Sequence, residues 1–174
     1  NIATGRRQTI ARGRAAARSP RSLFCGQALC AHSHGVTRLS VDTRAAAALA
    51  IADVFSGQSL DRALARQENR VKTRDLGLLR ELCYGTLRHE PRLTAILAQL
   101  LDKPLKDKDR DIQALLLCGL YQLDFTRVPD HAAVAATVEA TRALKKHWAK
   151  NLSNALLRRF LREREPLLQA LDDA

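Results

Sequence analysis

The stretch at residues 108–125, KDRDIQALLLCGLYQLDF, decides the fold of this chain. Its apolar residues recur at the three- and four-residue spacing of one helix face, and further apolar residues fill the flanks of that face. The stripe and its flanks comprise Ile112, Leu115, Leu116, Leu117, Cys118, Leu120, Tyr121 and Leu123. A helix that is apolar nearly all round is normally buried among other elements. We therefore expect this segment to be the central helix of a bundle.

Six further segments with helical periodicity lie on either side of the central one. We expect them at about residues 43–56, 60–64, 74–89, 91–102, 130–146 and 148–162. Gly57 is placed to close the first, and Ser59, Thr73 and Asp130 are placed to cap the second, third and sixth helices of the chain. No β-branched alternation, Asn-Gly hairpin signal or long internal repeat occurs, which disfavours sheets and solenoids. The predicted fold class is all-α, a compact seven-helix bundle.

The third predicted helix contains two glycines, Gly77 and Gly85. Glycine lowers helix stability, so its presence inside a helix suggests close packing against a neighbouring helix. Cys83 in the same helix and Cys118 in the central helix both lie on apolar stripes. We expect them to be inert core residues.

The basic charge of the chain is unevenly distributed. Residues 1–44 hold eight basic side chains and one acidic one, whereas residues 45–174 hold 21 and 17. Because residues 1–42 lack an apolar stripe, we expect a disordered basic leader. Its Arg-rich composition equally fits an organelle transit peptide, a basic RNA-contacting arm or upstream translated sequence. The overall surplus of positive charge favours a nucleic-acid partner, and no apolar run is long enough to suggest a membrane span.

The sequence offers no persuasive catalytic or metal site. It has no glycine-rich phosphate loop and no nucleophile paired with a base at a recognisable spacing. Cys25, Cys30, His32 and His34 are close together in the leader, but their spacing matches no common zinc motif. We expect no catalytic residue and no bound metal in this chain.

Two groups of polar residues near the C-terminus are candidate RNA contacts. Asn151, Asn154, Arg158 and Arg162 recur on one face of the seventh predicted helix. Arginine binds phosphate oxygens and Asn amides can bind base edges or sugars, although a solvated helix face explains the stripe equally well. The turn before that helix gathers Arg142, Lys145, Lys146, His147 and Lys150. A helix C-terminus attracts some of these cations, but their density favours a phosphate contact.

The remaining candidates are single residues. Arg44, Arg88 and Arg127 are the next RNA contacts we consider, although the helix dipole is the favoured explanation for Arg88 and the adjacent His89. Trp148 lies beside the basic cluster, but its helical spacing with Leu152 favours a place in the core.

Several motifs resemble one family along nearly the whole of residues 43–168. They are ELCYGTLR at residues 81–88, GLYQL at 119–123, TRVP at 126–129, HAAV at 131–134, TVE at 137–139 and NALLR at 154–158. In order and spacing these motifs resemble the N-terminal, NusB-like domain of the ribosomal RNA small subunit methyltransferase B family. The chain departs from the family pattern at Asp130, Ser153 and Leu156, and none of these changes breaks a bundle.

The resemblance implies a seven-helix domain over residues 43–168 that binds RNA, expected to be small-subunit ribosomal RNA, in a cytoplasmic protein that we expect to be monomeric. Residues 169–174 would begin a linker to a catalytic domain. In the family that domain holds S-adenosylmethionine and two cysteines, one of which attacks cytosine. Neither cysteine carries over onto Cys83 or Cys118, so we expect no cofactor in this chain. The alternative is a stand-alone NusB-type transcription antitermination factor that binds RNA and a ribosomal protein.

Overall fold

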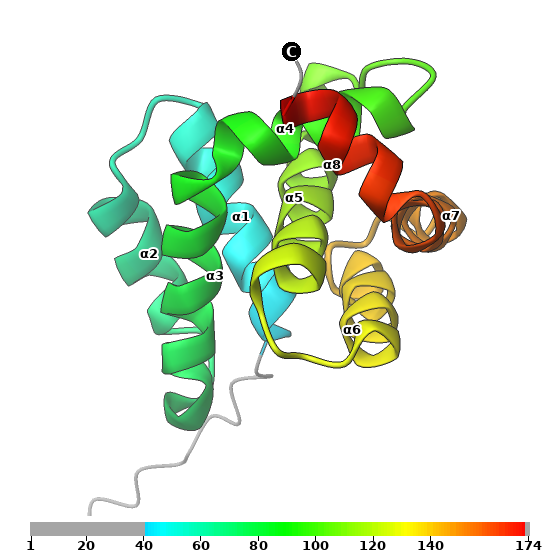
Figure 1. Ribbon diagram of the computed structural model, residues 1–174. Coiled ribbons are helices and arrows are strands. Elements are labelled where there is room, and N and C mark those ends of the chain that lie inside the picture. Colours follow the sequence, from blue (N-terminus) through cyan, green and yellow to red (C-terminus); the bar gives the residue numbers. More distant parts are fainter. Residues whose placement is uncertain (1–40, 173–174) are drawn as a thin grey trace, which may run out of the picture. The chain divides into compact units, whose positions relative to one another are not determined.

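The computed structural model describes residues 41–172, and this part of the chain consists of helices without a strand (Figure 1). The α-helices are α1 (Thr43–Phe55), α2 (Leu60–Glu68), α3 (Leu76–Arg88), α4 (Glu90–Leu100), α5 (Arg110–Phe125), α6 (Asp130–Ala143), α7 (Ala149–Arg162) and α8 (Arg164–Asp172). Two 3₁₀ turns, η1 (Thr73–Asp75) and η2 (Asp107–Asp109), precede α3 and α5. The all-α class and the seven expected helices are confirmed, and α8 is an additional helix. The expected leader lies outside the described residues apart from its last two positions.

Helix α5 lies at the centre of the bundle, as its sequence predicts. It packs against α1, α3, α4, α6 and α7, which surround it in Figure 1. Eleven of its 16 residues are buried, including the apolar flanks of its main stripe. Because each fully buried leucine stabilises a fold by about 1.5–3 kcal/mol, this helix supplies a large part of the hydrophobic core.

Helix α1 is buried on more of its surface than one stripe would require. Its alanines at positions 45–48 and 50 and Ile51 are all fully buried. The helix contacts α2, α3, α5 and α6, and small side chains allow helix axes to approach closely. A carboxylate oxygen of Asp42 caps the helix by accepting bonds from the N–H groups of Arg44 at 2.9 Å and Ala45 at 3.2 Å.

The other helix ends differ in part from the sequence expectation. Gly57 follows the end of α1 with a φ of 91°, which confirms it as the residue that closes this helix. Ser59 occupies the N-cap position of α2, but its side chain makes no capping bond. The expected caps Thr73 and Asp130 are wrong, because Thr73 begins the η1 turn and Asp130 already belongs to α6, after Pro129 at the N-cap.

The two glycines of α3 have different surroundings. A Cβ added to Gly85 would overlap the Cζ and hydroxyl oxygen of Tyr121 and lie 2.6 Å from its Cε1. Gly85 therefore permits the close packing on a neighbouring helix that the sequence suggested, and that neighbour is α5. A Cβ added to Gly77 would meet no atom within 4 Å, so close packing does not explain that glycine.

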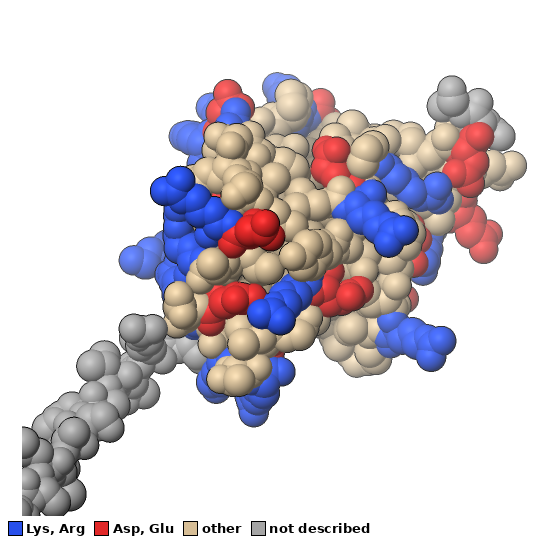
Figure 2. Space-filling model, turned by 90° about the vertical axis from the view of Figure 1, so that its left-hand side faces the viewer, with Lys and Arg blue, Asp and Glu red and all other residues tan. Residues whose placement is uncertain are grey.

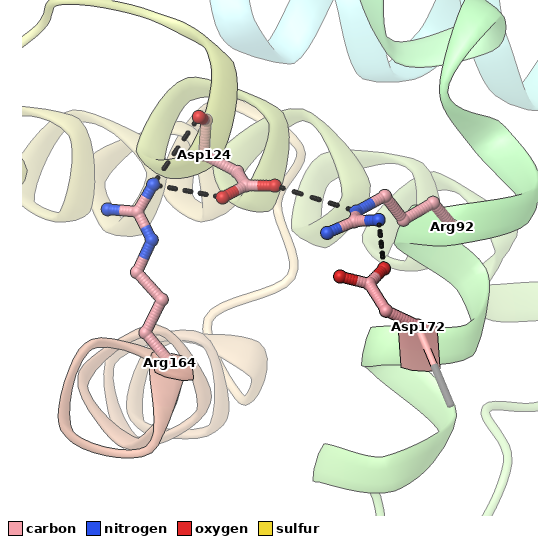
Figure 3. A network of polar contacts seen from close by, with 4 residues as sticks. All are labelled: Arg92, Asp124, Arg164 and Asp172. Carbon is pink, nitrogen blue, oxygen red and sulfur yellow. Dashed lines mark hydrogen bonds and ion pairs between the residues drawn. The ribbon is translucent and has the colours of Figure 1, made fainter. Parts of the chain in front are cut away.

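Helix α8 is attached to the bundle by an ionic network and by apolar contacts (Figure 3). Asp124 on α5, whose side chain is 7% exposed, lies between Arg164 at the start of α8 and Arg92 on α4. Arg164 Nη2 is 2.9 Å from Asp124 Oδ1, and Arg92 Nη1 is 2.9 Å from Asp172 Oδ1 at the end of α8. Three leucines of α8, Leu167, Leu168 and Leu171, pack against the core. The expected boundary after residue 168 therefore falls within a helix that is docked on the bundle.

Candidate nucleic-acid interface

Lys146 holds the turn between α6 and α7 against the start of α5. Its Nζ is 2.7 Å from Asp109 Oδ1 and 3.7 Å from Asp111 Oδ1, and it donates a hydrogen bond to the carbonyl oxygen of Lys108. The hydrogen bond with Asp109 is the main cause of a raised pKa of the Lys146 amino group. The side chain is 25% exposed and its amino group is already bound by two carboxylates, so Lys146 is less available to a phosphate than the basic cluster in the sequence suggested. This geometry gives Lys146 a structural role.

Arg142 also has a carboxylate partner, but a weak one. Its Nη1 is 2.9 Å from Glu139 Oε1, and both side chains are about 60% exposed. Exposed ion pairs contribute about 0–1 kcal/mol to stability, so Arg142 can readily exchange Glu139 for another anion. Arg142 therefore remains available to a phosphate.

The polar stripe of α7 lies on the surface as expected. Asn151, Arg158 and Arg162 are exposed, and Asn154 is half-buried. Asn154 Oδ1 accepts a hydrogen bond from Arg158 Nε at 3.0 Å, which orients the guanidinium. Within residues 41–172 neither Arg158 nor Arg162 forms an ion pair with a carboxylate. Two cations are thus presented from one helix face.

Lys145 and Lys150 extend this surface to the N-terminal end of α7. Both side chains are exposed, and neither has a carboxylate partner in the described part of the chain. Lys145 has a φ of 58°, a left-handed conformation that turns the chain sharply after α6. We call Lys145, Lys150, Asn151, Asn154, Arg158 and Arg162 the α7 surface.

Trp148 is exposed, so the expectation that it belongs to the core is wrong. It is 51% exposed at the N-cap position of α7. The inward positions of α7 begin one residue later, at Ala149, and continue through Ser153 to Phe160. This face packs closely on α5, because a Cβ added to Gly119 of α5 would lie 3.1 Å from Leu157. The pair Ala149 and Ser153 was the sequence signal that could have indicated this helix phase.

Arg44, Arg88 and Arg127 lie near the C-terminal end of α5. Arg44 Nε donates to the side-chain oxygen of the buried Gln122 at 2.9 Å. Arg88 is exposed at the end of α3, and Arg127 is exposed two residues after α5 ends. Lys146 contacts the opposite end of α5, so the length of that helix, about 24 Å, separates these three arginines from the turn before α7. The C-terminal end of α7 lies nearer to them, because Arg164, two residues after Arg162, pairs with Asp124.

The face formed by α2 and α3 has a different charge pattern. Figure 2 shows basic side chains interspersed with acidic ones there. Arg66 is 2.8 Å from Asp53 and Arg80 is 2.7 Å from Glu68. Paired charges of this kind attract a polyanion less than unpaired cations do. This face supplies control positions for the experiments below.

The two cysteines of the bundle are confirmed as core residues. Cys83 and Cys118 are both fully buried, and Thr86 Oγ1 donates a hydrogen bond to Cys118 Sγ at 3.7 Å. Burial raises the pKa of each thiol to about 12. A neutral thiol is a poor nucleophile, so neither residue is suited to covalent catalysis.

Residues 41–172 contain no group of three or more His, Cys, Asp or Glu side chains placed to hold a metal ion. The four cysteine and histidine residues considered as ligands in the leader lie outside the described residues. Among the described helices, none combines the length and the apolar character that crossing a bilayer requires.

Comparison with known proteins adds a family and a set of relatives. The model of the NusB family matches residues 41–162. The chain is 52% identical over 133 residues to "Ribosomal RNA small subunit methyltransferase B" of Pseudomonas putida, a match that covers 76% of this chain and 30% of that protein. Proteins of the same name from Pasteurella multocida and Proteus mirabilis are 51% and 46% identical over 133 residues. The chain thus spans about 30% of the length of these relatives.

Proposed function

Because this chain belongs to the NusB family, we propose that its helical bundle binds RNA and docks a cytosine-C5 methyltransferase onto small-subunit ribosomal RNA. The relatives near 50% identity support the ribosomal RNA as partner, since their name states that substrate. Residues 41–172 contribute binding, not bond making. We further propose that the protein acts in the cytoplasm as a monomer.

The α7 surface is the observation that supports this proposal. It presents four cations without carboxylate partners in the described part of the chain, together with two Asn amides. The exposed Trp148 lies at its N-terminal end, where it can stack on an unpaired base. Cations, amides and an aromatic ring are the groups that recognise single-stranded RNA.

S-adenosylmethionine supplies the methyl group in the family that the chain resembles. Residues 41–172 do not fit this cofactor. Adenosine-containing cofactors typically bind where a strand leads through a glycine-rich turn into a helix, and the described residues contain no strand. The methyl-transfer step therefore has no counterpart among them.

A stand-alone antitermination factor is the second candidate, favoured by the family match itself. Such a factor would require a ribosomal protein partner as well as RNA. The identity of about 50% to the methyltransferases favours the first candidate.

The test is RNA binding by the full chain with two charges reversed on the α7 surface. Lys150→Glu/Arg158→Glu should weaken binding of a fluorescein-labelled single-stranded RNA, measured by anisotropy over a range of salt concentrations. Each lost phosphate contact lowers the slope of log affinity against log salt by about 0.7. Two contacts should therefore reduce the slope by about 1.4.

The matched control is Arg62→Glu/Lys72→Glu, which changes the net charge equally on exposed residues of α2 and the adjoining turn. It should leave the affinity near that of the unmodified chain, apart from a small long-range effect. Equal loss in both variants would show that total charge alone decides binding. That result would refute the α7 surface as the RNA site.

A further inference from the structure

Helices α3 and α5 run parallel along a shared seam that ends in aromatic rings. The hydroxyl of Tyr121 donates to Glu81 Oε1 at 2.5 Å, and its ring occupies the space over Gly85. Four residues further along both helices, Phe125 stacks on His89 with ring centroids 3.9 Å apart and planes 19° apart. From the contact of Gly85 with Tyr121 to that of His89 with Phe125, both partners advance by four residues, as expected of helices that run in the same direction.

The three rings of this seam form a preorganised surface. The centroid of Tyr121 lies 5.7 Å from that of Phe125 and 6.1 Å from that of His89, and all three planes lie within 23° of one another. Tyr121 is buried, His89 is half-buried, and Phe125 is 39% exposed. An accessible aromatic ring is therefore held in a fixed orientation by two others.

Cations flank the exposed ring without carboxylate partners. Arg88 lies on the same side of α3 as Glu81 and Gly85, because these positions are seven and three residues apart along the helix. Arg127 follows Phe125 by two residues. Both side chains are exposed, and within residues 41–172 neither forms an ion pair. Glu81, the acidic group of the seam, lies two helical turns before His89, about 12 Å away.

Helix dipoles explain only part of this arrangement. The C-terminal ends of α3 and α5 both favour a nearby cation, which accounts for the arginines. The dipoles do not account for the parallel rings of His89, Tyr121 and Phe125, since aliphatic side chains would cover the seam equally well. Rings with a free face flanked by unpaired arginines are complementary to a nucleobase with its phosphates.

We propose that the end of the α3–α5 seam holds one unpaired RNA base, stacked on Phe125, while Arg88 and Arg127 contact the adjacent phosphates. This proposal rests on the proposed function of RNA binding. We call these three residues and His89 the seam platform. Since it lies at the other end of α5 from the turn before α7, a strand that reaches both the platform and that turn extends for about 24 Å along the bundle.

The test replaces the exposed ring in the full chain. Phe125→Leu removes stacking but keeps an apolar side chain, and it should weaken binding of single-stranded RNA by roughly 5- to 140-fold, which corresponds to about 1–3 kcal/mol. The salt slope should stay unchanged, because no charge is lost. Arg88→Gln should instead reduce that slope by about 0.7. Phe125→Tyr should retain the affinity.

Tyr84→Leu is the matched control. Tyr84 is 51% exposed on α3, but it lines a hollow in which the carboxylates of Asp61 and Glu68 outnumber the one cation, Arg80, so that a phosphate is disfavoured there. This variant should bind RNA as the unmodified chain does. A direct probe is Trp148→Phe/Phe125→Trp, which moves the single tryptophan of the chain to the platform. Its emission should change when unlabelled RNA is added.

The outcomes separate this proposal from the proposed function. If RNA binds and Lys150→Glu/Arg158→Glu weakens it, but Phe125→Leu binds as tightly as Tyr84→Leu, the platform is refuted and the α7 surface stands. If the unmodified chain does not bind RNA, the proposed function itself fails. An unchanged emission of the relocated tryptophan in the presence of saturating RNA would also refute the platform.

Discussion

Substitution of Gly85 by alanine should destabilise the bundle, although alanine is the better helix former. The added methyl gains about 1 kcal/mol of helix propensity. It also overlaps the ring of Tyr121, which is only 5% exposed and cannot move without disturbing its neighbours. Overpacking of this kind costs about 1–3 kcal/mol. Displacement of the ring also weakens the 2.5 Å hydrogen bond from Tyr121 to Glu81, a further loss of about 1–2 kcal/mol.

The expected net loss of unfolding free energy is therefore about 1–4 kcal/mol. For a domain of this size it should lower Tm by about 4 °C per kcal/mol. Far-UV circular dichroism during chemical and thermal denaturation measures both quantities. Gly77→Ala is the matched control in the same helix, since its methyl meets no atom within 4 Å. It should leave stability unchanged or raise it by up to about 1 kcal/mol.

A double-mutant cycle tests the physical cause. In a Tyr121→Ala background, where the ring is absent, Gly85→Ala should become neutral or stabilising. If Gly85→Ala is as stable as Gly77→Ala in the otherwise unmodified chain, the close approach of α3 and α5 is not as described. If Gly85→Ala lowers the unfolding free energy equally with and without the Tyr121 ring, overlap with that ring is not the cause of the destabilisation.

Four other predictions concern different parts of the bundle. Trp148→Ala should weaken single-stranded RNA binding by about 1–3 kcal/mol, whereas Trp148→Phe should retain most of the affinity, as measured by anisotropy. Equal affinities of Trp148→Ala and the unmodified chain would exclude stacking at the turn. Asp124→Asn should destabilise the bundle by about 1–2 kcal/mol, less than the loss of a fully buried ion pair would cost, because both partner arginines are more than a third exposed. The same variant should speed amide hydrogen exchange in α8, and unchanged exchange would contradict the ionic attachment of that helix. Cys83 and Cys118, with pKa values of about 12, should react with a thiol reagent at neutral pH only as fast as the bundle opens, so rapid labelling of folded protein would be inconsistent with their burial. Burial raises the pKa of Tyr121 from 10 to about 12, so the contribution of this shift to stability is complete below pH 10 and is lost as pH rises through 12. The decrease in unfolding free energy between pH 10 and 12 should therefore be smaller in Tyr121→Phe than in the unmodified chain. An equal decrease in both proteins would show that ionisation of Tyr121 is not the cause.

Much of the fold could be predicted from the sequence, because helical periodicity is a local property. The apolar residues of residues 108–125 identify the central helix, since a segment that is apolar on nearly every side must be covered by neighbours. The same spacing locates α1 through α7. Helix α8 was not predicted, because it buries no residue fully and its apolar positions matter only when α4 and α7 are present to receive them.

The candidate RNA contacts could be listed from the sequence but not sorted. Spacing along α7 placed Asn154, Arg158 and Arg162 on one face, which is a property of a single helix. It could not show that Lys146 is held by Asp109 and Asp111, residues more than 30 positions earlier. Ion pairing between distant segments depends on how helices meet, and no local pattern encodes that.

By itself the sequence determined the helices, the central place of α5 and the polar face of α7, because each follows from contacts within a few residues of the chain. Only the tertiary structure decided which faces meet. It set the phase of α7, which leaves Trp148 in solvent and buries Ala149, and the parallel register that places His89 against Phe125. Both follow from side-chain packing between helices, whose relative rotation and register are fixed by many distant contacts together and by no single segment.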